Sequence, residues 1–279
     1  MVGKPDAGWS AQQPRRDVPD GTVSIGVDLS TDPKSTALAV IHWRDDGCND
    51  LTFLKRPVEH AELVDVLNGW DYLVAAIDVP FGWPDQFASF IGSHQSNVLG
   101  GVPSAGTDEA EEWRTQQLAL RATDQYVKKK LGLRPISVGF NLLGATAAAW
   151  SLIEAAITSG PADRTGIVLT GDKLIVETYP SAQMHVWNGS AVPEREGVER
   201  TMDVIESLAS QFSIELGDGR QALTSSPDLR DAFVCALTAG LITTTSQRRP
   251  MTDDVKSAQS KREGVIWLHD PTAGALWGK

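Results

Sequence analysis

The sequence predicts an α/β fold built on a mixed five-stranded sheet, with strand order 3-2-1-4-5 and helices on both faces. Three observations predict it. First, three short runs of β-forming residues near the N-terminus are separated by turn-forming residues, which is typical of an antiparallel meander. Second, a helical pattern and then a continuous apolar run, typical of a buried strand, follow the meander. Third, a helix between two strands favours a crossover to a parallel neighbour.

The first elements are placed by these patterns and by the turn residues between them. The meander strands are expected at Thr22–Asp28, Thr36–Trp43 and Leu51–Arg56. The spacing of apolar residues predicts a helix over Glu59–Trp70, and the apolar run predicts a fourth strand over Tyr72–Val79. The Pro- and Gly-rich segment that follows should end this strand.

The segment Phe81–Gly171 is expected to be a largely helical insert between strands four and five. Within it, Asp85–Pro103 has no clear periodicity and predicts a loop. Acidic residues begin Asp108–Leu131 and lysines end it, which matches the helix dipole and predicts one long helix. The remaining elements are expected to be helices at Leu142–Ile157, Glu194–Gln211 and Pro227–Thr243, a fifth strand at Leu174–Glu177 and a final strand at Glu263–His269.

The chain is interpreted as a single domain, residues 21–279, that follows a flexible tail, residues 1–20, without apolar periodicity. Cys48 and Cys235 lie far apart, so a disulfide framework is not indicated and a reducing compartment is favoured. The N-terminal segment lacks the apolar stretch of a signal peptide, and no window resembles a membrane helix. These features predict a cytoplasmic protein with no membrane partner, and they leave its oligomeric state open.

The charge balance argues against a protein that coats nucleic acid through bulk positive charge. Lys and Arg number 25 and Asp and Glu 36, which gives a net charge of −11. A local basic groove is still compatible with this balance, and a divalent metal ion could bridge acidic groups to a phosphate.

Four carboxylates occupy positions where a binding site is expected. Asp28, Asp78 and Glu177 each end a predicted strand, and Asp231 lies near the start of an apolar helix. The ends of parallel neighbouring strands open onto one crevice, in which α/β proteins bind ligands. Each acid also has an ordinary structural explanation, because such residues cap turns, face solvent or begin helices. The order of all four along the chain is what favours a shared site.

A cluster of this kind has the chemistry of a magnesium or manganese site. Oxygen-rich acidic sites suit these ions. Crowded carboxylates raise one another's pKa unless a metal keeps them ionised. Two such ions about 4 Å apart would stabilise both the attacking and the leaving oxygen in phosphodiester cleavage. We therefore expect Mg²⁺ or Mn²⁺ as the cofactor.

Six short motifs together resemble the predicted RNase H-like nuclease family known as domain of unknown function 429. The motifs are Gly26-Val27-Asp28, Ile77-Asp78-Val79-Pro80-Phe81-Gly82, Arg121-Ala122-Thr123-Asp124, Glu177-Thr178-Tyr179-Pro180, Asp231 to Ala239, and Glu263 to Trp267. The resemblance runs from about Thr22 to His269. It implies an RNase H-like fold and a metal-dependent nuclease or phosphodiesterase. Its catalytic and metal-binding residues would be Asp28, Asp78, Glu177 and Asp231.

The same resemblance suggests residues that would bind the substrate. Arg121 and Asp124 would face the site, with Arg121 on a phosphate. On helix spacing alone they would be a surface ion pair. Lys128 belongs to the densest basic cluster of the chain, Lys128–Lys130 with Arg134, which is either a solvated face or a contact to a nucleic-acid backbone. The expected partner is thus nucleic acid or another phosphoester.

Two other functions compete with the nuclease hypothesis. Gly26–Thr31 also looks like the first phosphate loop of sugar kinases and related ATPases, which would make the protein an ATP-dependent phosphotransferase. That hypothesis needs a second phosphate loop and an adenosine loop, for which the chain offers only poor candidates. A non-enzymatic binding protein on the same fold is the third alternative. The sequence does not distinguish DNA, RNA and small phosphoesters as substrates.

Overall fold

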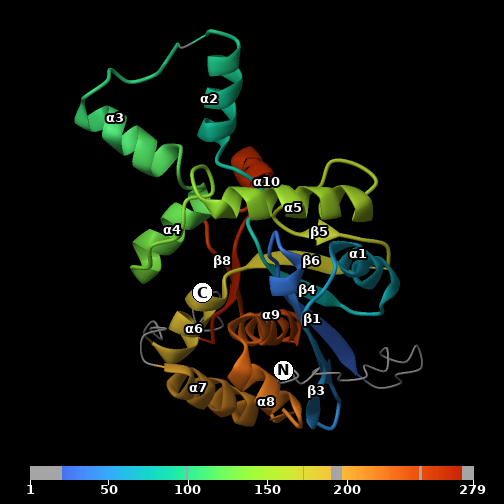
Figure 1. Ribbon diagram of the computed structural model, residues 1–279. Coiled ribbons are helices and arrows are strands. Elements are labelled where there is room, and N and C mark those ends of the chain that lie inside the picture. The colour runs from blue at the N-terminus through green and yellow to red at the C-terminus, as the bar shows by residue number, and fades with distance from the viewer. Residues whose placement is uncertain (1–20, 99, 172, 190–196, 245–246, 272–279) are drawn as a thin grey trace, which may run out of the picture.

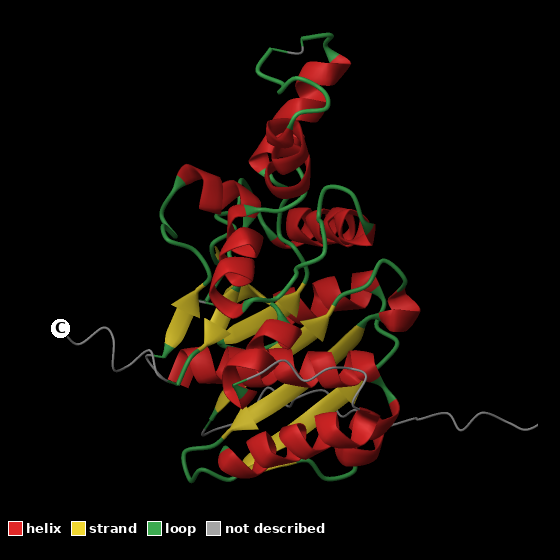
Figure 2. Ribbon diagram, turned by 90° about the vertical axis from the view of Figure 1, so that its left-hand side faces the viewer, coloured by secondary structure: helices red, strands yellow, loops and turns green. Residues whose placement is uncertain are grey.

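The protein is built around a seven-stranded mixed sheet with helices on both faces (Figures 1 and 2). The computed structural model describes residues 21–98, 100–171, 173–189, 197–244 and 247–271. The strands are β1 (Thr22–Asp28), β2 (Ala37–Trp43), β3 (Asn49–Lys55), β4 (Val74–Asp78), β5 (Ile167–Val168), β6 (Leu174–Thr178) and β7 (Ile214–Glu215). The predicted tail, residues 1–20, lies outside the described residues.

The strand order across the sheet is β5-β6-β4-β1-β2-β3-β7. β1, β2 and β3 form an antiparallel meander, whereas β4 is parallel to β1 and β6 is parallel to β4. The prediction of a mixed α/β fold is confirmed, but the predicted number of five strands is wrong. The two edge strands, β5 and β7, are only two residues long, which is too short to produce a recognisable alternation in the sequence.

Helices cover both faces of the sheet. On the first face, α9 (Pro227–Thr244) packs across β1, β2 and β4. On the second face, α1 (His60–Gly69) and α5 (Leu142–Ile157) enclose a core that includes Val27 and Ile77. Because side chains alternate along a strand, Gly26 and Asp28 are on the face of α9, and Val27 is on the face of α1 and α5.

The contact between α9 and β1 is unusually close, and Gly26 makes it possible. A Cβ atom at Gly26 would lie 2.0 Å from the backbone nitrogen of Ala236 and 2.1 Å from the carbonyl oxygen of Ala232. Buried hydrogen bonds fix the same contact: Trp43 Nε1 donates to Ser24 Oγ at 2.8 Å, and Ser24 Oγ donates to the Ala236 carbonyl at 2.8 Å. The backbones of helix and strand therefore touch without an intervening side chain.

Two predictions for the insert are wrong. The expected loop contains a helix, α2 (Asp85–Gln95), and the expected long helix is broken into α3 (Asp108–Glu112), a π-helical turn (Trp113–Gln117) and α4 (Ala122–Leu131). α2 and α3 project away from the sheet in both views (Figures 1 and 2), and neither contains a buried residue. This explains why α2 shows no clear apolar periodicity. The long helix breaks because Leu118, Ala119 and Leu120 turn into the core before α4 begins.

The C-terminal part contains α6 (Pro180–Asn188), α7 (Gly197–Gln211), α8 (Gly219–Ser225), β8 (Arg248–Pro250), α10 (Ala258–Glu263) and β9 (Trp267–His269). α7 and α8 contact β7 and β3 at one end of the sheet, whereas β9 contacts β6 near the other end. The predicted final strand is shorter than expected, because its first residue ends α10. It pairs with β8 in a separate two-stranded sheet, and only Ile266 bridges to Glu177 of β6. None of the helices within the described ranges is both long and apolar enough to cross a bilayer.

Replacing Gly26 by alanine should destabilise the protein strongly. The added methyl group would meet backbone atoms of α9, which cannot move aside as a flexible side chain does. We expect the free energy of unfolding to fall by at least about 3 kcal/mol, as measured by urea denaturation. Gly92→Ala in α2 is the control, because no atom lies within 4 Å of its added Cβ. Equal stability of the two variants would contradict this account of the α9–β1 contact.

Candidate functional site

Two of the predicted acids stand side by side at the carboxyl ends of β1 and β4. Asp28 pairs with Asp78 in the parallel ladder, and Asp78 pairs in turn with Thr178 of β6. Paired residues on neighbouring strands place their side chains on the same face of a sheet. The two side chains thus share the face that α9 covers, and each residue is largely buried there.

The first turns of α9 bring more negative charge to this pair. Burial and the charges of Asp231 and Asp228 raise the pKa of Asp28 from its ordinary 3.8 to about 8, although the charge of Arg56 lowers it. Burial, and then the charges of Asp28 and Asp231, raise the pKa of Asp78 well above its ordinary value. Three of the four predicted acids therefore interact at this edge of the sheet. We call Asp28, Asp78 and Asp231 the aspartate group.

Glu177 is on the opposite face of the sheet. It pairs with Ile77, one residue before Asp78, so its side chain is directed toward the face of α1 and α5. Both of its carboxylate oxygens are engaged there. Oε1 accepts from Arg121 Nη2 at 2.6 Å, and Oε2 accepts from Arg121 Nη1 at 2.8 Å and from the backbone N–H of Phe81 at 3.0 Å. Glu177 still affects Asp78 through its charge, which is the smallest of the four influences that raise the pKa of Asp78.

Arg121 and Asp124 belong to this second, buried cluster. The Arg121 side chain is 2 % exposed and that of Asp124 is 4 % exposed. Asp124 accepts from Arg121 Nε and Nη2, both at 3.0 Å, and from the Arg121 backbone N–H that begins α4. Arg121 Nη1 also donates to the carbonyl of Glu263 at 3.0 Å. The guanidinium thus joins α4, β6 and the end of α10 in the interior, whereas Lys128 is exposed on α4 and donates to Gln116.

Three further residues, which the sequence patterns do not single out, lie beside Asp28 and Asp78 at the carboxyl edge of the sheet. Arg56 and Asp228 form an ion pair, with Nε and Oδ2 2.6 Å apart. Tyr179 follows β6, and burial and then the charge of Asp78 raise the pKa of its hydroxyl group. In the sequence, only their positions could have indicated these residues. Arg56 ends the third predicted strand, and Tyr179 follows shortly after Glu177.

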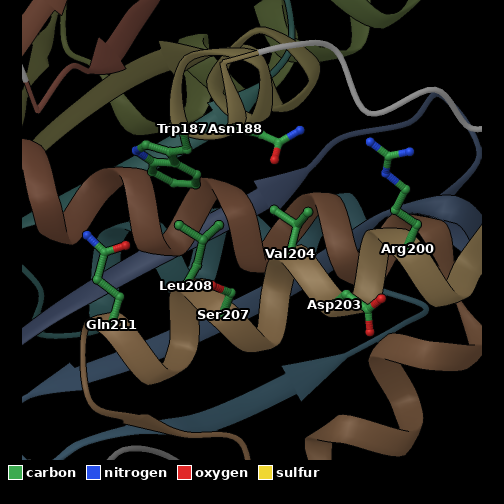
Figure 3. Close-up of a pocket in the computed structure, with 8 residues that line it drawn as sticks. All are labelled: Trp187, Asn188, Arg200, Asp203, Val204, Ser207, Leu208 and Gln211. Atoms are coloured by element: carbon green, nitrogen blue, oxygen red, sulfur yellow. The ribbon is translucent and has the colours of Figure 1, made fainter.

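The aspartate group does not form a finished metal cage. Within the described part of the chain, no three Asp, Glu, His or Cys side chains are arranged to hold a metal ion as they stand. A separate pocket of about 410 Å³ lies between α6 and α7 (Figure 3). Trp187, Asn188, Arg200, Asp203, Val204, Ser207, Leu208 and Gln211 line it. None of these is a residue that the sequence predicted for the site.

The Arg121 cluster should be essential for stability. Arg121→Leu would leave the carboxyl groups of Glu177 and Asp124 buried without their counter-ion, and we expect a loss of about 3–5 kcal/mol in urea denaturation. Arg114→Leu is the control, because its ion pair with Glu111 is exposed and should be worth less than about 1 kcal/mol. An Arg121→Leu protein that is fully stable but binds phosphoesters poorly would instead support the substrate-binding role predicted from the sequence.

The aspartate group should make the metal-free protein less stable as the pH rises from 6.5 to 8. A carboxyl group with a raised pKa in the folded state binds its proton more tightly when folded, so stability falls with rising pH between the unfolded and folded pKa values. Burial lowers the pKa of His269 from 6.5 to about 4, an opposite effect that fades above pH 6.5 as the unfolded histidine loses its remaining proton. In EDTA, the melting temperature of the wild type should therefore decrease across this window. The melting temperature of Asp28→Asn should decrease less over the same pH range. An equal decrease in both proteins would contradict the raised pKa of Asp28.

Comparison with family models gives one match, which covers residues 26–255 and is described as a protein of unknown function, DUF429. Comparisons with curated proteins and with solved structures give no match. The matched range begins at the close contact between β1 and α9 and includes Asp28, Asp78, Glu177 and Asp231. The match spans most of the chain, and the protein therefore belongs to the DUF429 family.

Proposed function

We propose that the protein is a divalent-metal-dependent phosphodiesterase of the RNase H-like type, with nucleic acid or another phosphoester as substrate. The observation that carries the proposal is the pairing of Asp28 with Asp78 at the carboxyl ends of adjacent parallel strands, beneath the first turns of α9. The order β3-β2-β1-β4-β6 within the sheet, with an antiparallel meander followed by parallel neighbours, supports the RNase H-like type.

The donor set suits a magnesium or manganese ion. Mg²⁺ is commonly bound through one or two carboxylates, with water and substrate phosphates completing its shell, so a cage of three protein ligands is not required. Asp28 and Asp78 would supply the carboxylates, and Asp231 would add charge or a further oxygen. The mutual repulsion that raises the pKa values of Asp28 and Asp78 is what a divalent cation would offset.

Each residue then has a distinct part in the reaction. When bound, the ion would supply Lewis-acid activation of the phosphoryl group and of the attacking water. Asp28 and Asp78 would hold that ion at the carboxyl edge of the sheet, where water and the substrate phosphate would complete its shell, and Asp231 would add negative charge beside them. Glu177 is a positioning residue in this scheme. Its bond to the Phe81 N–H holds the chain just beyond Asp78, and Arg121 fixes Glu177.

Cleavage activity should depend on the paired aspartates and on the metal. We expect Mn²⁺-dependent cleavage in a panel of single-stranded, duplex and branched DNA and RNA together with small phosphodiesters. Asp28→Asn and Asp78→Asn should each lower the rate by more than about 100-fold, because changes to residues that only orient a metal ligand already cost about 10- to 100-fold. Asp71→Asn is the matched control, because Asp71 is an exposed aspartate at the other end of β4. All variants should keep the fold by circular dichroism.

Thermal stability separates the competing functions. Mn²⁺ alone should raise the melting temperature of the wild type, and not that of Asp28→Asn, if the paired aspartates hold the ion. A shift that requires ATP together with the metal would instead favour the phosphotransferase. No shift with either, and no cleavage in the panel, would contradict the proposal and leave the non-enzymatic binding protein as the better hypothesis.

A further inference from the structure

Arg56 is placed beside the paired aspartates by the end of β3 and by its ion pair with α9. Leu38 of β2 pairs with Lys55, the last residue of β3, and Arg56 follows Lys55 directly. Ala37, the residue before Leu38, pairs with Asp28. The row that crosses the carboxyl edge of the sheet is therefore Ala37, Asp28, Asp78 and Thr178. Side chains in one such row share one face, here the face of α9.

Arg56 lies beyond Ala37 at the end of this row, and its ion pair with Asp228 of α9 places its side chain on the face of α9. Ala37 is fully buried and too small to block the longer Arg56 side chain. The guanidinium charge acts on Asp28, whose pKa it lowers against the effects of burial and of the neighbouring acids. A cation thus lies beside the carboxylates of this edge. Arg230, the arginine in the first turns of α9, is instead engaged with the carbonyl oxygens of Leu223 and Thr224.

The resting partner of Arg56 is Asp228, in the first turn of α9. Arg56 Nε lies 2.6 Å from Asp228 Oδ2, and the two side chains are 38 % and 23 % exposed. Ion pairs that exposed contribute little to stability, because water competes for both charges. A stronger ligand can therefore replace Asp228 at small cost. The planar guanidinium has five N–H donors and can bind two oxygens of a phosphate at once. A phosphate is therefore a stronger ligand for Arg56 than the single contact with Asp228.

The geometry points to Arg56 as an oxyanion subsite, which binds a non-bridging phosphate oxygen of the substrate in exchange for Asp228. The identity of the anion as a phosphoester rests on the proposed function, whereas the presence of an anion subsite does not. A phosphate that enters this edge meets the carboxylates of Asp28, Asp78, Asp228 and Asp231, and it needs a cation to offset their repulsion. Arg56 is accordingly a binding residue that should act on affinity more than on turnover.

Inorganic phosphate is the probe that tests the subsite without any cleavage reaction. In the presence of Mg²⁺, phosphate should raise the melting temperature of the wild type and of Arg56→Lys, which keeps the charge but not the fork of donors, with a smaller rise in the latter. Arg56→Gln should show no rise. Asp228→Asn, which releases Arg56 from its partner, should show a larger rise than the wild type.

The matched control is Arg44→Gln. Arg44 is an exposed arginine that pairs with Asp50 beyond the opposite end of β2, so its loss removes the same charge and the same kind of ion pair away from the site. It should respond to phosphate as the wild type does. In a cleavage assay with a substrate found active, Arg56→Gln should raise KM by about tenfold or more, with a smaller change in kcat.

The subsite and the proposed function fail in different ways. Equal phosphate responses in the wild type and Arg56→Gln, or no response in the wild type, would overturn the subsite, even if Mn²⁺-dependent cleavage is present. A phosphate response that is lost in Arg56→Gln would establish the subsite, even if no substrate in the panel is cleaved. In the second case the protein would be an anion-binding protein, and the phosphodiesterase proposal would be the one to abandon.

Discussion

The contact between α9 and β1 at Gly26 is the constraint on which the candidate site depends. Because no side chain separates the two backbones there, the first turns of α9 come down onto the ends of β1 and β4. The hydrogen bonds from Trp43 through Ser24 to Ala236 hold the helix at that distance. The charges of Asp228 and Asp231 then act on Asp28 as a result of how the core is packed. The electrostatics of the edge thus follow from a close backbone contact in the interior.

The two faces of the sheet handle their acids in opposite ways. On the face of α1 and α5, Glu177 and Asp124 are neutralised by the buried guanidinium of Arg121. On the face of α9, no buried cation among the described residues pairs with Asp28 or Asp78, and burial together with the neighbouring acids raises their pKa values. The first arrangement fixes α4, β6 and α10 together. The second retains an electrostatic cost that a bound cation would relieve, which is typical of functional sites.

Much of the fold was accessible from sequence patterns, because the relevant signals were local. The alternation in Thr22–Asp28 and the alanine-rich run of Leu142–Ile157 gave the bounds of β1 and α5 as the structure has them. The placement of Glu177 was not accessible. β6 continues one residue further, so Thr178, and not Glu177, is level with Asp78. That difference depends on strand register, and the partner of Glu177, Arg121, is distant in the sequence. Arg56 was missed for the same reason, since only the pairing of β2 with β3 relates it to Asp28.

Asp78 faces α9 only because of the parity of its position in β4. One residue inserted in β4 before Asp78 would turn its carboxyl group to the face that holds Arg121, whereas two inserted residues would return it. The turn just after Pro80 is fixed in another way, because Phe81 is buried against Trp150 and donates its N–H to Glu177. Changes of length should therefore be tolerated best in the exposed connection between α2 and α3, and only in even steps within β4.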